Sequence, residues 1–95
     1  MTESRQVAAK DLILAIDNGT QSVRALLFDK FGSLLLKSRV PIEPYFSTAP
    51  GLAEQHPEVF WEAVCQACKE LMVLIDQSEK EGISRQRIAG MSITT

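Results

Sequence analysis

The sequence predicts an α/β fold, in which a three-stranded antiparallel meander is followed by one helix and a fourth strand. Three observations predict it: an unbroken apolar run that ends near an Asn-Gly pair, two further strand-like runs separated by turn residues, and a helical stripe that leads into a last apolar segment. A strand that follows a helical crossover runs parallel to its neighbour in a right-handed connection. If the fourth strand pairs with the first, the strand order is 3-2-1-4.

The first strand is expected from Leu12 to Ile16, because this unbroken apolar run is typical of a strand buried on both faces. Asp17 and then Asn18-Gly19 follow it directly. An Asn-Gly pair between two apolar runs indicates a tight hairpin, since both residues tolerate the positive φ that the turn requires. The second strand then covers residues 20–28. Period-two alternation places Val23, Ala25 and Leu27 on one face, and Thr20, Ser22, Arg24, Leu26 and Phe28 on the other.

A second turn is expected at Asp29 to Gly32, where Gly32 can adopt the left-handed conformation. Ser33 to Ile42 continues as the third strand until Pro41 and Pro44 limit further ladder pairing. Residues 43–55 contain two prolines and a glycine, which predicts an ordered loop across the sheet edge.

A helix is predicted to begin at Pro57, whose missing N–H would have no partner in the first turn, with Glu58 at the positive end of the dipole. Its apolar residues recur at three- and four-residue steps until the segment from Ser78 to Gly82, and Ser84 is expected to cap one more short turn. The predicted stripe contains Phe60, Val64, Ala67, Cys68, Leu71, Leu74 and Ile75.

The fourth strand is expected from Arg87 to Thr95. In the order 3-2-1-4 its polar end would lie beside the end of the first strand, and ligands of open α/β sheets bind outside the carboxyl ends of such strands. The polar residues that this arrangement brings together are Ser92, Thr94 and Thr95 with Asp17, Asn18 and Gly19.

Size and composition exclude several classes of function. The chain has 95 residues, of which 45% are hydrophobic and 23% charged, as expected of one small globular domain or part of a larger one. The formal net charge is −2 and the basic residues are scattered, which argues against nucleic acid as a partner. No apolar run approaches the roughly 20 residues that cross a bilayer, and Met1 to Asp11 has no signal-peptide core. We therefore expect a cytoplasmic protein without membrane partners, with residues 1–10 as a flexible leader.

The two cysteines, Cys65 and Cys68, form a lone C-x-x-C pair inside the predicted helix. They offer too few ligands for a structural zinc site, and a redox pair normally lies at a helix N-terminus. They are interpreted as small core residues.

The first hairpin contains the residues whose side chains are suited to binding a phosphate. From Asp17 to Arg24 it combines a carboxylate, a glycine turn, two hydroxyls and a guanidinium within eight residues. Glycine lets backbone N–H groups approach an anion, and a carboxylate can hold the Mg²⁺ that accompanies ATP. The residues alone leave open a plain Asn-Gly hairpin with a solvated arginine, because hairpins are far commoner than phosphate sites.

Two segments resemble a known family. The hairpin resembles the first phosphate motif of the sugar kinase, Hsp70 and actin superfamily, in the sequence IDNGTQSVRALLFD. The later segment from Pro50 to Val64 resembles a stretch typical of FGGY carbohydrate kinases of the glycerol kinase and xylulokinase type, in the sequence PGLAEQHPEVFWEAV. The closing IAGMSITT resembles the strand that leads into sugar-contacting residues in those kinases. Leu52 and His56 depart from the frequent Trp and Asp of the family.

The resemblance implies a ribonuclease H-like fold of the actin-like ATPase superfamily, with residues 11–95 as an incomplete first lobe. It implies that Asp17 orients Mg²⁺, through water, and that Gly19, Thr20, Gln21, Ser22 and Arg24 contact the phosphates of ATP. The general-base aspartate and the residues that hold the sugar or polyol would lie beyond Thr95, so no catalytic residue is expected in this chain. The implied activity is ATP-dependent phosphorylation of a sugar or polyol hydroxyl. The alternative is a non-catalytic ATP-binding switch or structural protein of the Hsp70 and actin group, and self-association into a homo-oligomer stays open.

Overall fold

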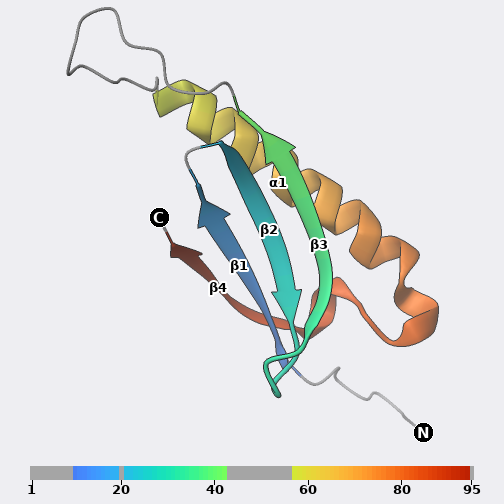
Figure 1. Cartoon of the computed structure of the whole chain (residues 1–95). Coiled ribbons are helices and arrows are strands. Elements are labelled where there is room, and N and C mark those ends of the chain that lie inside the picture. The colour runs from blue at the N-terminus through green and yellow to red at the C-terminus, as the bar shows by residue number, and fades with distance from the viewer. Residues whose placement is uncertain (1–9, 20, 43–56, 95) are drawn as a thin grey trace, which may run out of the picture.

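The computed structural model describes residues 10–19, 21–42 and 57–94. In this part of the chain, four strands form one mixed sheet of order β3-β2-β1-β4, with a helix on one face (Figure 1). The predicted α/β class, strand order and strand directions are confirmed. The elements are β1 Leu12–Asn18, β2 Ser22–Phe28, β3 Leu34–Pro41, α1 Pro57–Gln77, and β4 Ile88–Thr94.

The strand β1 lies inside the sheet, between β2 and β4. It pairs antiparallel with β2, which sets Asp17 opposite Arg24, and parallel with β4, which sets Asp17 opposite Thr94. Paired residues of neighbouring strands point to the same face of a sheet. The ladder therefore places these three side chains in one row across the sheet.

The helix α1 covers only part of one face. It lies against β2 and β3 and barely reaches β1 (Figure 1). Ser38 on β3 donates a hydrogen bond of 2.7 Å from its Oγ to the carbonyl oxygen of Ala67 in α1, which ties the helix to the edge strand. Ala63 is buried as well, although the predicted stripe did not include it. The buried core consists of Leu12, Leu14, Ile16, Val23, Ala25, Leu27 and Val40 from the sheet, and Ala63, Ala67, Leu71 and Ile75 from the helix.

The prediction that the first strand is buried on both faces is wrong for the described part of the chain. Leu12, Leu14 and Ile16 are buried on the helix side, whereas Ile13 on the other side is 39% exposed. The reason is that α1 packs on one face of the sheet, and no other described helix covers the opposite face. We call that opposite face the open face.

The predicted tight turn at Asn18-Gly19 is also wrong. Asn18 is the last residue of β1 and still pairs with Val23, and neither Asn18 nor Gly19 has a positive φ. The N–H of Gly19 donates to the carbonyl oxygen of Ser22 over 2.9 Å, so the chain reverses after Gly19. Glycine is required there because the two strand ends come close together: a Cβ on Gly19 would lie 3.1 Å from the carbonyl oxygen of Ser22.

The second turn forms as predicted. Gly32 adopts the left-handed conformation with φ of 84°. Asp29 stabilises the turn, because its Oδ1 accepts hydrogen bonds of 2.9 Å from the N–H groups of Phe31 and Ser33.

Two short 3₁₀ helices, η1 Glu79–Glu81 and η2 Arg85–Arg87, connect α1 to β4. Ser84 lies at the N-cap position of η2 as predicted, but its side chain makes no capping hydrogen bond. Two bidentate ion pairs hold η2 instead, Arg85 with Asp76 and Arg87 with Asp11.

The two cysteines lie inside α1 and are free thiols. Burial raises the pKa of the Cys68 thiol, and Cys68 packs against the core as predicted. Cys65 is half-buried and is not among the described residues that pack against the core. Among the described residues, no helix is both long enough and apolar enough to cross a membrane. The predicted leader (apart from Lys10) and the predicted loop at residues 43–55 lie outside the described residues.

Candidate functional site

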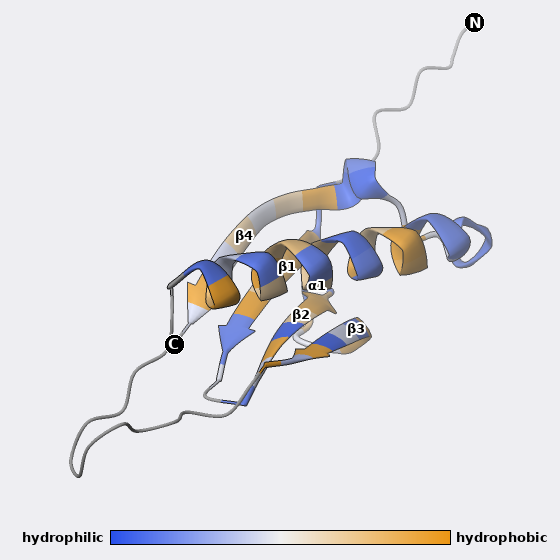
Figure 2. Cartoon of the chain, turned by 90° about the horizontal axis from the view of Figure 1, so that it is seen from above, coloured by the Kyte–Doolittle hydropathy of each residue, from blue (hydrophilic) through white to orange (hydrophobic). Residues whose placement is uncertain are grey.

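Asp17 lies near the carboxyl end of β1, where an otherwise hydrophobic strand becomes hydrophilic (Figure 2). Its side chain is 31% exposed, and its Oδ2 accepts a hydrogen bond from Nη2 of Arg24 on β2. The guanidinium of Arg24 is half-exposed. A carboxylate and a guanidinium therefore meet at the surface of the open face, and strand pairing alone brings them together.

The other carboxylate oxygen faces β4. Oδ1 of Asp17 lies 3.5 Å from Oγ1 of Thr94, and the same hydroxyl lies 3.4 Å from the carbonyl oxygen of Ile16. Sequence reasoning placed Thr94 beside Asp17 but gave it no role. The sequence did contain a signal for such a role, because the strand predicted to lie next to Asp17 ends in polar residues.

The turn residues are held by the backbone. The N–H of Gly19 is bonded to Ser22, and the carbonyl oxygen of Gln21 accepts a hydrogen bond of 3.0 Å from the N–H of Ile42. Gln21 is exposed and Ser22 is half-buried. Alternation along β2 puts Ser22 on the open face with Arg24. Thr20, the remaining predicted phosphate contact, lies outside the described residues.

A second cation extends the row. Arg39 on β3 pairs with Arg24 in the antiparallel ladder and is exposed. The open face thus carries Arg39, Arg24, Asp17 and Thr94 in order across the four strands. Two neighbouring guanidiniums favour the binding of an anion. Sequence reasoning missed Arg39 because the register of β3 against β2 was not fixed by any motif.

One residue of the hairpin points elsewhere. The Oδ1 of Asn18 is buried and has no hydrogen-bond partner among the described residues. Alternation places it on the helix side with Ile16, away from the row that contains Asp17.

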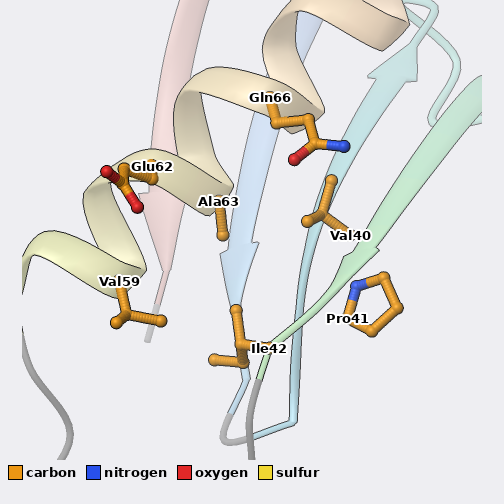
Figure 3. A pocket seen from close by; sticks show the side chains of 7 residues that line it. All are labelled: Val40, Pro41, Ile42, Val59, Glu62, Ala63 and Gln66. Carbon is orange, nitrogen blue, oxygen red and sulfur yellow. The ribbon is translucent and has the colours of Figure 1, made fainter.

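A cavity of about 350 Å³ lies on the helix side, between the end of β3 and the first turns of α1 (Figure 3). It contains no residue of the row on the open face. Its lining residues are Val40, Pro41, Ile42, Val59, Glu62, Ala63 and Gln66. The described residues among those predicted to bind phosphate or Mg²⁺ therefore lie at the sheet end and do not line this cavity.

The described residues contain no group of three or more His, Cys, Asp or Glu side chains that could hold a metal ion. A cation at this sheet end would have Asp17 as its carboxylate. Mg²⁺ commonly binds through one or two carboxylates together with water and the phosphates of a substrate. The partly exposed carboxylate of Asp17 fits that kind of site.

Comparison with known proteins decides the family. Residues 12–95 match the N-terminal domain of the FGGY family of carbohydrate kinases. The chain belongs to this family. The resemblance in the hairpin and in the segment from Pro50 to Val64 is therefore confirmed.

Similar curated proteins include a glycerol kinase from Parabacteroides distasonis, 35% identical over 79% of this chain and 16% of that protein. An apulose kinase from Pectobacterium atrosepticum is 36% identical over 80% of this chain and 16% of that protein. The chain thus spans about 16% of the length of these curated relatives.

Solved structures show the same fold. A xyloylose kinase from Brucella ovis superimposes with a TM-score of 0.71 at 23% identity, over 86% of this chain and 16% of that one. A gluconate kinase from Lactobacillus acidophilus gives a TM-score of 0.62 at 24% identity, over 87% of this chain and 15% of that one. The described residues therefore have the fold of the corresponding part of these two kinases.

Proposed function

We propose that the full-length protein carrying this chain transfers the γ-phosphoryl group of ATP to a hydroxyl of a sugar or polyol. The first hairpin of the FGGY domain contacts the phosphates in this proposal. The observation that carries it is the row on the open face, where a partly exposed carboxylate and two exposed guanidiniums lie beside the carboxyl end of β1. Such an end is where open α/β sheets bind ligands.

Each residue of the hairpin has a proposed task. Arg24 has five N–H donors, of which one is bonded to Asp17, so others can reach phosphate oxygens. Ser22 and Thr20 supply hydroxyl donors, Gln21 a side-chain amide, and Gly19 allows the hairpin end to stay narrow. Phosphoryl transfer depends chiefly on positioning and on spreading negative charge, and these donors serve both purposes.

Asp17 is the proposed partner of Mg²⁺, through water. When bound, the ion neutralises charge that develops on the transferred phosphoryl group. The carboxylate of Asp17 keeps acceptor capacity on Oδ1, because only Oδ2 is bonded to Arg24. Asp17 thus holds the hydration shell of the ion beside the phosphate donors of the hairpin.

The acceptor is proposed to be a sugar or polyol, since the relatives are named glycerol kinase and apulose kinase. The general base that takes the proton from the acceptor hydroxyl is expected outside this chain. Membership of the carbohydrate kinase family favours an enzyme over a non-catalytic ATP-binding switch of the Hsp70 and actin group.

The test is Asp17→Asn in the full-length protein, assayed with ATP, Mg²⁺ and a panel of sugars and polyols. We expect turnover to fall by at least about 100-fold, because one charge-stabilising contact in a phosphoryl-transfer site is worth that much. The thermal midpoint should stay close to the wild-type value.

The matched control is Glu70→Gln on the exposed surface of α1, which removes the same charge far from the row. It should leave turnover unchanged. Wild-type turnover by the Asp17→Asn protein on every substrate that the wild type phosphorylates would refute the proposed role of the hairpin.

A further inference from the structure

The carboxylate of Asp17 has a different neighbour on each oxygen. Oδ2 accepts a hydrogen bond from Arg24 on β2, and Oδ1 lies 3.5 Å from Oγ1 of Thr94 on β4. The two neighbours come from strands on opposite sides of β1, and both are fixed by the strand register. The carboxylate is therefore flanked from both sides within the plane of the sheet.

A second contact on a carboxylate restricts the orientation of its plane. The torsion that turns the carboxylate plane of an aspartate is broad, so one hydrogen bond leaves the plane free to swing. The side chain of Thr94 is β-branched and stiff at χ1, which fixes the place of its hydroxyl beside Oδ1. The hydroxyl has one proton to donate, and the Ile16 carbonyl oxygen at 3.4 Å is the other acceptor within its reach.

We propose that Thr94 is a positioning residue for Asp17: its hydroxyl donates to Oδ1 and fixes the carboxylate plane, so that the remaining acceptor sites face the hydration shell of Mg²⁺. This inference rests on the proposed role of Asp17. The distance of 3.5 Å is long for a hydrogen bond, and such contacts commonly tighten when the ligand of a site is bound.

The experiment uses Thr94→Val in the full-length protein, because valine keeps the branched shape and removes the hydroxyl. Binding of ADP is measured by calorimetry over a series of Mg²⁺ concentrations and in EDTA. Loss of a residue that orients a metal ligand typically lowers metal affinity about 10- to 100-fold. The Mg²⁺-dependent gain in ADP affinity should therefore need about tenfold more Mg²⁺. ADP affinity in EDTA and the thermal midpoint should not change.

Two further variants make the result specific. Thr94→Ser keeps the hydroxyl and should restore most of the Mg²⁺ dependence, while Thr94→Ala gives a second variant without the hydroxyl if the valine protein does not fold. Ser92→Ala is the matched control, because Ser92 lies two residues earlier on the same face of β4, where it pairs with Ala15. It should behave as the wild type.

The outcomes separate this inference from the proposed function. If Asp17→Asn abolishes the Mg²⁺ dependence but Thr94→Val and Thr94→Ala leave it intact, the positioning role of Thr94 is wrong and the proposed function stands. An equal loss in Ser92→Ala would also overturn the positioning role, since it would indicate a general effect on β4. If the wild type itself binds ADP without any effect of Mg²⁺, the proposed role of Asp17 is wrong, and the positioning role of Thr94 is wrong with it.

Discussion

At the scale of single residues, two glycines of this chain are required for opposite reasons. Gly19 has no positive φ, but a Cβ there would lie 3.1 Å from the Ser22 carbonyl oxygen. Gly32 has φ of 84°, and a Cβ at this position would meet no atom within 4 Å. At position 19 the lack of space disfavours a side chain, and at position 32 the backbone conformation disfavours one.

Alanine at these two positions should have different effects, one on ADP affinity and the other on stability. Gly19→Ala should push Ser22 away and weaken ADP binding about 2- to 10-fold, the equivalent of one hydrogen bond, with little change in stability. Gly32→Ala should lower the free energy of unfolding by about 1 kcal/mol or more and leave ADP affinity unchanged, because an L residue is strained at positive φ. Calorimetry and urea unfolding of both full-length variants measure the two effects. The same loss of ADP affinity in both would contradict it.

The candidate residues on the first hairpin were predictable from the sequence, but the conformation of the turn was not. Alternation along residues 20–28 predicted that Ser22 and Arg24 share a face, and the structure places Asp17 on that face as well. The turn itself was assigned to the wrong residues because Asn18 stays extended in the ladder with Val23. Ladder hydrogen bonds outweighed the local preference of Asn-Gly for positive φ.

At the scale of elements, the strands and α1 follow the hydrophobic periodicity closely. The helix begins at Pro57 as predicted, and three of the four helix residues in the core belong to the predicted stripe, namely Ala67, Leu71 and Ile75. Ala63 was missed although it lies four residues before Ala67 and continues the same stripe, so the helical periodicity could have included it.

The connection from α1 to β4 depends on ion pairs, which predicts a pH effect. Hydrogen bonds from Arg87 lower the pKa of Asp11, and hydrogen bonds from Arg85 lower the pKa of Asp76, both from an ordinary value of 3.8. A carboxyl whose pKa is lowered on folding stabilises the fold above its ordinary pKa, and this contribution is lost as the pH falls through the lowered value. Stability should therefore decrease below about pH 4.

The variant that tests this is Asp11→Asn, followed by urea unfolding at about pH 6 and about pH 2.5, on either side of the ordinary carboxyl pKa. The variant should be less stable than the wild type at the higher pH, and the two should converge at the lower pH, where the wild-type carboxyl is protonated as well. Asp76→Asn should behave similarly but more weakly in high salt, since its partner Arg85 is 57% exposed. A stability difference that is the same at both pH values would rule out the ion pair as its cause.

At the scale of the whole molecule, the helix covers one part of the sheet and leaves β4 uncovered. Met91 and Ile93 pair with Leu14 and Ile16 and point to the helix side, yet they are 61% and 57% exposed because α1 lies over β2 and β3. The strand order alone could not predict this, since it depends on where α1 crosses the sheet. β4 is also an edge strand, whose outer N–H and C=O groups have no ladder partner among the described residues.

An uncovered apolar edge strand is a template for pairing with a second copy, so the isolated 95-residue chain should self-associate. Sedimentation velocity over a range of concentrations should give a sedimentation coefficient that rises with concentration. Ile93→Lys should suppress this rise, because a charge on the apolar side of β4 opposes burial against another chain. Phe31→Lys is the control: Phe31 is 81% exposed but lies in the turn between β2 and β3, so the substitution should not alter association. Equal suppression by both variants would indicate a general charge effect and not an interface at β4.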